Sequence, residues 1–187
     1  KGFRPRAEQV DRATAVGNAI EQQGALVVEA GTGTGKTFAY LAPASLAKKK
    51  TIISTGSKNL QDQLFNRDLP AIQKALGYSG KIALLKGRTN YLCLERLEQV
   101  IAQGVLGDRS VLHDLSKVRK WRNATKTGDL SECIEIAEDS PILPQLTSTA
   151  ESCLGSDCPN YADCFVALAR KKALNADLVV VNHHLFF

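Results

Sequence analysis

The run Ala30-Gly-Thr-Gly-Thr-Gly-Lys36-Thr37 combines closely spaced glycines with a lysine and a threonine. It follows the apolar run ALVVEA at residues 25–30, which predicts a short strand, and it leads into residues 36–46, which predict a helix. Glycines let backbone N–H groups approach a polyphosphate, and the start of a helix adds unpaired N–H groups and the positive end of its dipole. The spacing is that of a P-loop with alanine in the first position, and it predicts nucleotide binding.

Each polar residue of this loop has an expected role. Lys36 would reach the β and γ phosphates of ATP, and the Thr37 hydroxyl would bind Mg²⁺. The predicted ATP-binding positions of the loop are Ala30, Gly31, Thr32, Gly33, Thr34, Gly35, Lys36 and Thr37, with Lys36 and Thr37 also catalytic. The alternative is a glycine-rich turn between strand and helix that binds no ligand.

The cysteines form a second group of residues that could do chemistry. Cys153, Cys158 and Cys164 are spaced C-x4-C-x5-C, and Cys93 lies sixty residues earlier. Three neighbouring thiolates and a distant fourth can meet around zinc or an iron–sulfur cluster once the chain folds. The spacing favours a metal over free thiols but leaves its identity open, and Cys133 reads as a core residue.

The elements that would position these groups alternate between strand and helix. Helix patterns occupy residues 7–22, 36–46 and 57–76, the last opened by Ser57 and expected to break at Pro70. Strand patterns occupy 25–30, 51–54, 81–87 and the apolar run ADLVVVN before His183, and the pattern predicts that residues 51–54 are buried. This order, together with the glycine loop, predicts an α/β P-loop fold with a parallel sheet that has helices on both faces.

The alternation stops between residues 91 and 165. This stretch contains helix patterns at 91–103 and 108–122, followed by a polar region that holds most of the cysteines. We therefore expect a motor-like domain at 1–90, a mainly helical, cysteine-bearing insertion at 91–165, and a return to the first domain at 166–187.

Composition narrows the class of protein. The 187 residues carry a net charge of +5, a mild basic excess that permits a phosphate-rich partner without demonstrating one. No membrane span or export signal is evident in the sequence. Because the chain has no export signal, its five cysteines indicate a protein of a reducing compartment. The chain begins at Lys1 and contains no methionine, so we expect it to be part of a longer protein.

Six segments together resemble one family. FRPRAEQ, EAGTGTGKT, STGSKNLQDQL, LLKGRTNYLC, CLGSDCPNYADC and ADLVVVNHHLF occur in the order seen in superfamily 2 iron–sulfur DNA helicases of the XPD/DinG family. The resemblance covers essentially the whole chain. Its discriminating part is the cysteine pattern, because many unrelated NTPases share the P-loop.

The resemblance implies a RecA-like motor domain and an ATP-dependent 5′→3′ DNA helicase that acts on single-stranded, damaged or stalled DNA. Cys93, Cys153, Cys158 and Cys164 would bind a [4Fe–4S] cluster, and Gln9 would read adenine, although Gln9 also suits an ordinary surface helix. The implied location is the bacterial cytoplasm, on the nucleoid. The implied partners are single-stranded DNA and the chi subunit of the replicative clamp loader.

The same resemblance assigns DNA contacts. Ser54, Thr55 and Gly56 would bind the phosphates of one strand through hydroxyls and backbone amides, although Ser57 and its neighbours also suit a strand end and a helix cap. Arg88 is the basic candidate near Cys93. His183 and His184, taken as strand-end neighbours on opposite faces, are not expected to share an ion.

Two rival readings remain open. The chain could be a small-molecule P-loop NTPase with a structural zinc, or a nucleic-acid-binding module whose metal only supports the fold. The family continues into a DEAH box and a second motor domain, which this sequence lacks, so we expect no ATP turnover from these 187 residues alone.

Overall fold

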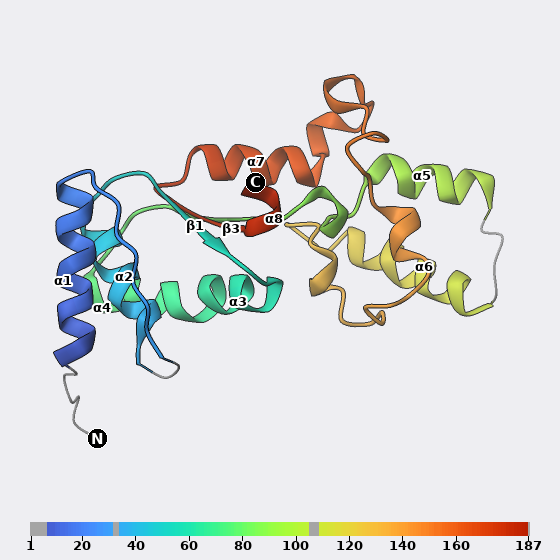
Figure 1. Cartoon of the computed structure of the whole chain (residues 1–187). Helices are drawn as coiled ribbons and strands as arrows, with labels where there is room; N and C mark the ends of the chain where they lie inside the picture. The colour runs from blue at the N-terminus through green and yellow to red at the C-terminus, as the bar shows by residue number, and fades with distance from the viewer. Residues whose placement is uncertain (1–6, 32–33, 105–108, 187) are drawn as a thin grey trace. The chain divides into compact units, whose positions relative to one another are not determined.

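The computed structural model describes residues 7–31, 34–104 and 109–186 and contains two compact units (Figure 1). One comprises Lys1–Leu85 with Ala173–Phe187, and the other is Lys86–Lys172. The sequence placed the corresponding boundaries after residues 90 and 165. A compact unit does not by itself show that a segment binds a cofactor, so the assignment of residues 91–165 as a cysteine-bearing insertion stays a prediction.

The first unit contains a parallel sheet of three strands, in the order β1-β3-β2. The strands are β1 (Thr51–Thr55), β2 (Ile82–Leu85) and β3 (Leu178–Asn182). Thr51 and Ile82 both pair with Leu178, on opposite sides of β3. The central strand therefore comes last in the sequence. The predicted α/β architecture with a parallel sheet is confirmed.

Alternation along β3 divides the core of this unit into two layers. Leu178 and Val180 face a cluster that also contains Leu41, Ile53, Leu64, Leu69 and Ile72. Val179 and Val181 face the opposite side, where Ala83, Ala173 and Ala176 pack. Successive side chains of a strand point to opposite faces, so the apolar run at residues 178–181 of β3 is the expected sequence for a strand covered on both faces.

Most helices follow their sequence patterns. They are α1 (Ala7–Glu21), α2 (Lys36–Leu46), α3 (Lys58–Gln63) and α4 (Leu69–Leu76). A π-helical segment, Leu64–Asp68, connects α3 to α4. The break was expected at Pro70, but Pro70 lies in the first turn of α4. Pro70 has no N–H to donate to the preceding turn, and the π-helical irregularity falls in that turn.

The second unit is built from α5 (Leu94–Gln103) and α6 (Arg109–Arg122) with short 3-10 turns. Those turns are Arg88–Asn90, Leu130–Glu132, Leu143–Leu146, Gly155–Asp157 and Tyr161–Asp163. Helix α7 (Phe165–Leu174) leads back toward β3. The buried core of the unit draws on both helices and the turns: Leu92, Leu94, Leu97, Val111, Leu115, Val118, Cys133, Ile136, Ile142 and Leu146. Cys133 is thus a core residue, as its sequence context indicated.

The expected strand at residues 25–30 is not present. These residues pair with none of the three strands, and Val27 is 98% exposed. An apolar run becomes a strand only where a neighbour completes its hydrogen bonds, and no described strand does so here.

Two other expectations were wrong in detail. Strand β1 is an edge strand and is not buried throughout, because Ile52 is 56% exposed while Ile53 is 9% exposed. His183 does not extend a strand: β3 ends at Asn182, and His183 begins the short helix α8 (His183–Phe186). The argument from strand alternation therefore does not apply to His183 and His184.

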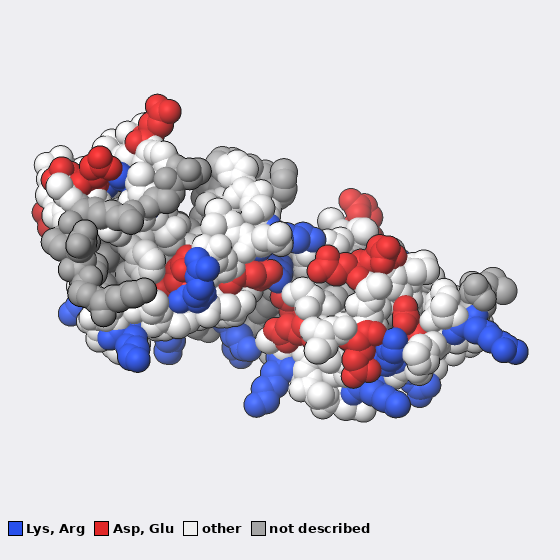
Figure 2. All heavy atoms as spheres, turned by 90° about the horizontal axis from the view of Figure 1, so that it is seen from below, with Lys and Arg blue, Asp and Glu red and all other residues white. Residues whose placement is uncertain are grey.

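The surface mixes both signs of charge. On the face drawn in Figure 2, Lys and Arg side chains are interspersed with Asp and Glu. Among the described residues, no helix combines the length and apolar character that crossing a membrane requires.

Candidate nucleotide-binding and cluster sites

The glycine loop lies directly before α2. Gly35 precedes the helix with a φ of 73°, a left-handed conformation that favours glycine. The Lys36 ammonium donates to the Ala30 carbonyl oxygen at 2.8 Å, and the Thr34 hydroxyl donates to the Gly31 carbonyl oxygen at 2.8 Å. These bonds fold the loop back on itself at the positive end of a helix, which suits an anion. Thr32 and Gly33 lie outside the described residues.

Two side chains of α1 contact this loop. Gln9 donates from Nε2 to the Gly35 carbonyl oxygen at 3.2 Å. A Cβ at Gly35 would lie 2.7 Å from that nitrogen, so a larger residue would displace the Gln9 side chain, while the left-handed φ is what requires glycine. Arg12 donates to the Thr34 hydroxyl at 3.0 Å, and its side chain is 16% exposed. The structure thus brings Gln9 to the predicted loop and adds Arg12, which the sequence analysis missed.

Thr37, the predicted Mg²⁺ ligand, lies in the first turn of α2. Its side chain hydrogen-bonds Tyr40 one turn later. Burial raises the pKa of Tyr40, the Thr37 hydrogen bond opposes that rise, and the Asp68 carboxylate adds to it.

The predicted DNA-contact residues of the first unit lie where β1 ends. The Ser54 hydroxyl is exposed and lies 3.3 Å from Nδ1 of His183, which follows β3. Thr55 is buried and donates to the carbonyl oxygens of Ser57 and Val181. A Cβ at Gly56 would meet nothing within 4 Å. The exposed hydroxyl of Ser54 and the open backbone at Gly56 are free of steric cover, whereas the Thr55 hydroxyl is used internally.

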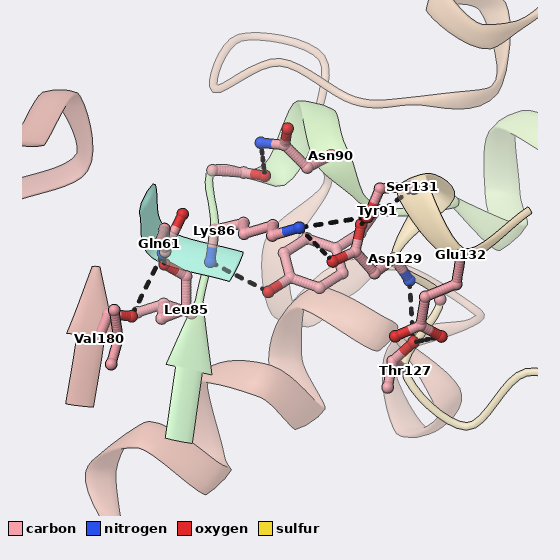
Figure 3. Close-up of polar contacts among 12 residues, drawn as sticks. Gln61, Leu85, Lys86, Asn90, Tyr91, Thr127, Asp129, Ser131, Glu132 and Val180 are labelled. Atoms are coloured by element: carbon pink, nitrogen blue, oxygen red, sulfur yellow. Dashed lines mark hydrogen bonds and ion pairs between the residues drawn. The ribbon is translucent and has the colours of Figure 1, made fainter. Parts of the chain in front are cut away.

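Ser57 caps the next helix. Its hydroxyl oxygen accepts from the Leu60 backbone N–H at 3.2 Å, as expected of an N-cap. Gln61 of the same helix is fully buried and donates to the carbonyl oxygens of Leu85 at 2.9 Å and Val180 at 3.3 Å (Figure 3). It ties α3 to the carboxyl ends of β2 and β3. A sequence pattern gives no signal for this role.

A buried ion pair lies at the start of the second unit. The Lys86 ammonium lies 2.7 Å from Oδ2 of Asp129, with the side chains 4% and 8% exposed (Figure 3). Lys86 also donates to the Ser131 hydroxyl, and its backbone N–H donates to the Tyr91 hydroxyl oxygen. Arg88, the predicted DNA contact of this unit, is half-buried and donates to the Thr149 carbonyl oxygen at 3.4 Å.

Two of the predicted cluster ligands, Cys158 and Cys164, act on the pKa of a third, Cys93. Burial raises the pKa of the Cys93 thiol, the backbone N–H groups of Arg96 and Glu95 lower it, and the charges of Cys158 and Cys164 raise it further. Cys93 directly precedes α5, and Cys164 directly precedes α7. The unpaired N–H groups of a helix start stabilise a thiolate.

The four predicted ligands are all half-buried free thiols. Among the described residues, no group of three or more His, Cys, Asp and Glu side chains is arranged to hold a single metal ion. Ligands to the separate iron atoms of a cluster need not converge on one point, as the ligands of a single ion must. The donor set of four thiols with helix-start N–H groups therefore fits an iron–sulfur cluster chemically.

The chain is similar to known helicases. The model of the DEAD/DEAH box helicase family matches residues 11–133. The chain is 81% identical over its full length to the ATP-dependent DNA helicase YoaA of Haemophilus influenzae, covering 29% of that protein. It is 63% identical to YoaA of Escherichia coli, over 99% of the chain and 29% of the relative.

A more distant relative matches the same region. The ATP-dependent helicase DinG of Mycobacterium tuberculosis is 36% identical over 98% of the chain and 31% of the relative. The chain thus spans less than a third of the length of these curated relatives. The family match covers the glycine loop, strands β1 and β2, and the part of the second unit up to Cys133. This chain belongs to the DEAD/DEAH box helicase family.

Proposed function

We propose that this chain is the N-terminal part of an ATP-driven DNA helicase that moves 5′→3′ along single-stranded DNA. The observation that carries the proposal is the closed glycine loop before α2, contacted from α1 by Gln9 and Arg12. ATP would release the Lys36 ammonium from the Ala30 carbonyl, because phosphate oxygens are stronger acceptors for an ammonium than a neutral carbonyl. Gln9 would then lie beside the loop, where an adenine base could meet its amide.

DNA would bind where the parallel strands end. Ser54 and Gly56 present an exposed hydroxyl and an open backbone after β1. Such groups can bind phosphates without reading bases, which suits a motor that must travel over any sequence. His183 would position the Ser54 hydroxyl, and Thr55 would fix the strand end through its internal bonds.

The second unit would carry a [4Fe–4S] cluster on Cys93, Cys153, Cys158 and Cys164. The cluster would cross-link segments that are distant in sequence, and the helix-start N–H groups of α5 and α7 would stabilise its thiolates. We further propose that the whole protein works on damaged or stalled DNA at the bacterial nucleoid. The chi subunit of the replicative clamp loader is the proposed partner, on the strength of the sequence resemblance alone.

The nucleotide site is tested in the full-length protein by Lys36→Ala, with Lys74→Ala on the exposed surface of α4 as the control. We expect K36A to abolish the ATP turnover that single-stranded DNA stimulates, because the phosphates lose their ammonium partner. K74A should match the wild type. Wild-type turnover by K36A would refute the assignment of this loop.

The cluster is tested by absorbance and metal analysis of anaerobically prepared protein. A broad band near ~400 nm together with bound iron supports an iron–sulfur cluster. A colourless protein containing zinc would instead favour a structural zinc site. Cysteine-to-serine changes at Cys93 and Cys158 should remove the band, whereas Cys133→Ala should keep it, because Cys133 packs in the core.

A further inference from the structure

One side-chain amide joins the cysteine-bearing loop to helix α5. Nδ2 of Asn160 donates to Oε2 of Glu95 at 3.2 Å and to Oε2 of Glu98 at 3.1 Å. The two glutamates are one helical turn apart, so their carboxylates repel each other unless a donor lies between them. Asn160 supplies that donor with a single NH₂ group, which has two hydrogens to share.

The orientation of this amide follows from its surroundings. Two carboxylates accept hydrogen bonds only, so the NH₂ group and not the carbonyl of Asn160 must face them. The other oxygen of Glu95, Oε1, accepts from Nε2 of Gln99 at 2.8 Å. Glu95 is therefore held in place from its own helix, which makes it a fixed anchor for Asn160.

The anchor and the amide lie close in sequence to the thiols. Glu95 is two residues after Cys93, and Asn160 is two residues after Cys158. We propose that Asn160 is a positioning residue, which holds the loop carrying Cys158 and Cys164 against the helix that begins after Cys93. The role of Asn160 in positioning cluster ligands rests on the proposed function. The hydrogen bonds from Asn160 to Glu95 and Glu98 are present without metal.

The loop around Asn160 can transmit this constraint to both of its cysteines. The Tyr161 backbone N–H donates to the Cys158 carbonyl oxygen at 3.0 Å, and the Cys164 N–H donates to the Tyr161 carbonyl oxygen at 3.2 Å. These successive turns make the segment compact. On the other side, the Cys93 N–H donates to the Leu146 carbonyl oxygen at 2.8 Å, which fixes Cys93 to the core. Asn160 links the two fixed parts.

The test uses Asn160→Asp, which keeps the shape of the side chain but replaces the donor with a third carboxylate. Asn123→Asp is the matched control, because Asn123 is exposed in the same unit. The triple variant N160D/E95Q/E98Q is the rescue, since the glutamine amides can donate to the new carboxylate. All are made in the full-length protein.

The first readout needs no metal. Metal-free protein is treated with dibromobimane, which bridges two nearby thiols, and the bridged peptides are identified by mass spectrometry. We expect bridges from Cys93 to Cys158 or Cys164 in the wild type and in N123D. N160D should form them roughly tenfold more slowly, the factor that one hydrogen bond to a charged group represents, and the triple variant should recover.

The second readout is the rate at which a chelator removes iron from the loaded protein, which should rise in N160D and recover in the triple variant. Equal bridging and iron loss in N160D and the wild type would overturn the proposal, as would a wild type without Cys93 bridges. If N160D does not fold, N160A replaces it in the same comparison. Normal bridging in a protein that never binds iron would refute the cluster and leave the Asn160 bridge standing.

Discussion

Before helix α2, three side chains of different chemistry converge on one short stretch of backbone. Lys36 binds the Ala30 carbonyl, Gln9 binds that of Gly35, and Arg12 binds the Thr34 hydroxyl. The glycine and lysine positions could be recognised from the sequence because a phosphate cradle needs those residue types at that spacing. Arg12 could not, because its role depends on how α1 approaches the loop in space.

Arg12 should therefore affect nucleotide affinity from outside the motif. Arg12→Gln in the full-length protein removes the charged donor to Thr34, and we expect ATP to bind roughly tenfold more weakly, as for one lost hydrogen bond to a charged group. Titration with a fluorescent ATP analogue measures this. Glu8→Gln is the control: it removes only the exposed partner of Arg12 at 3.6 Å, and surface pairs contribute little. Indistinguishable affinities for R12Q and E8Q would contradict this role.

The buried ion pair between Lys86 and Asp129 gives a prediction about stability. Lys86→Met should destabilise the protein by about 3–5 kcal/mol, because it leaves the Asp129 carboxylate buried without its counter-ion. The double variant K86M/D129L should recover much of that loss, since no uncompensated charge remains. Urea unfolding followed by fluorescence of Trp121, the single tryptophan, measures both. Equal loss in the single and double variants would show that the pair itself, not the orphaned charge, matters.

Helices and strands with a local signal were predictable, and those that depend on distant partners were not. The apolar faces of α5 and α6 can be recognised in the sequence, and residues 178–181 of β3 are all apolar because both faces of the strand are covered. Residues 25–30 have the same apolar character but no neighbouring strand among the described residues, so their composition predicted a strand that is not there. The π-helical segment before α4 also lacks a sequence signal beyond Pro70 itself.

One contact between α6 and a following turn should make stability depend on pH. The Ser140 hydroxyl donates to Asp114 at 2.7 Å, and this bond, helped by Lys117, lowers the pKa of Asp114. A depressed carboxyl pKa contributes stability above the ordinary carboxyl range, and that contribution disappears as the pH falls through the folded-state pKa. Ser140→Ala should therefore cost stability at about pH 7, and progressively less as the pH falls below the ordinary Asp pKa of about 4.

Denaturant unfolding at about pH 7 and below about pH 4 measures this difference. Ser116→Ala is the control, because the Ser116 hydroxyl is exposed on α6 and donates only to the His113 carbonyl at 2.7 Å. It should show no comparable change with pH. A Ser140→Ala loss that is the same at both pH values would mean that the hydroxyl stabilises the turn without acting through the Asp114 charge.

At the scale of the whole molecule, each unit has its own buried core. The core of the second unit contains none of the four predicted cluster ligands, and its only cysteine is Cys133. The position of the break in the strand and helix alternation could be read from the sequence. The cores could be read only in part, because Ile142 and Leu146 belong to short turns with no helical period.

Loss of the proposed iron–sulfur cluster should therefore leave this core folded. The half-buried Trp121 packs against this core and reports its state, and we expect its emission to stay unchanged after a chelator has removed iron from the proposed cluster. Leu146→Ala, at a fully buried position, is the comparison that should lower the unfolding free energy by roughly 2–5 kcal/mol. A shift of Trp121 emission to that of the unfolded chain on iron loss would contradict this expectation.

Leu26, Val27 and Val28 are exposed, and so is Ile52 on an edge strand of the sheet. Apolar chain beside unpaired backbone groups invites strands from other molecules. The purified 187-residue chain should consequently be prone to self-association, so protein concentration becomes a variable in any solution measurement made with it.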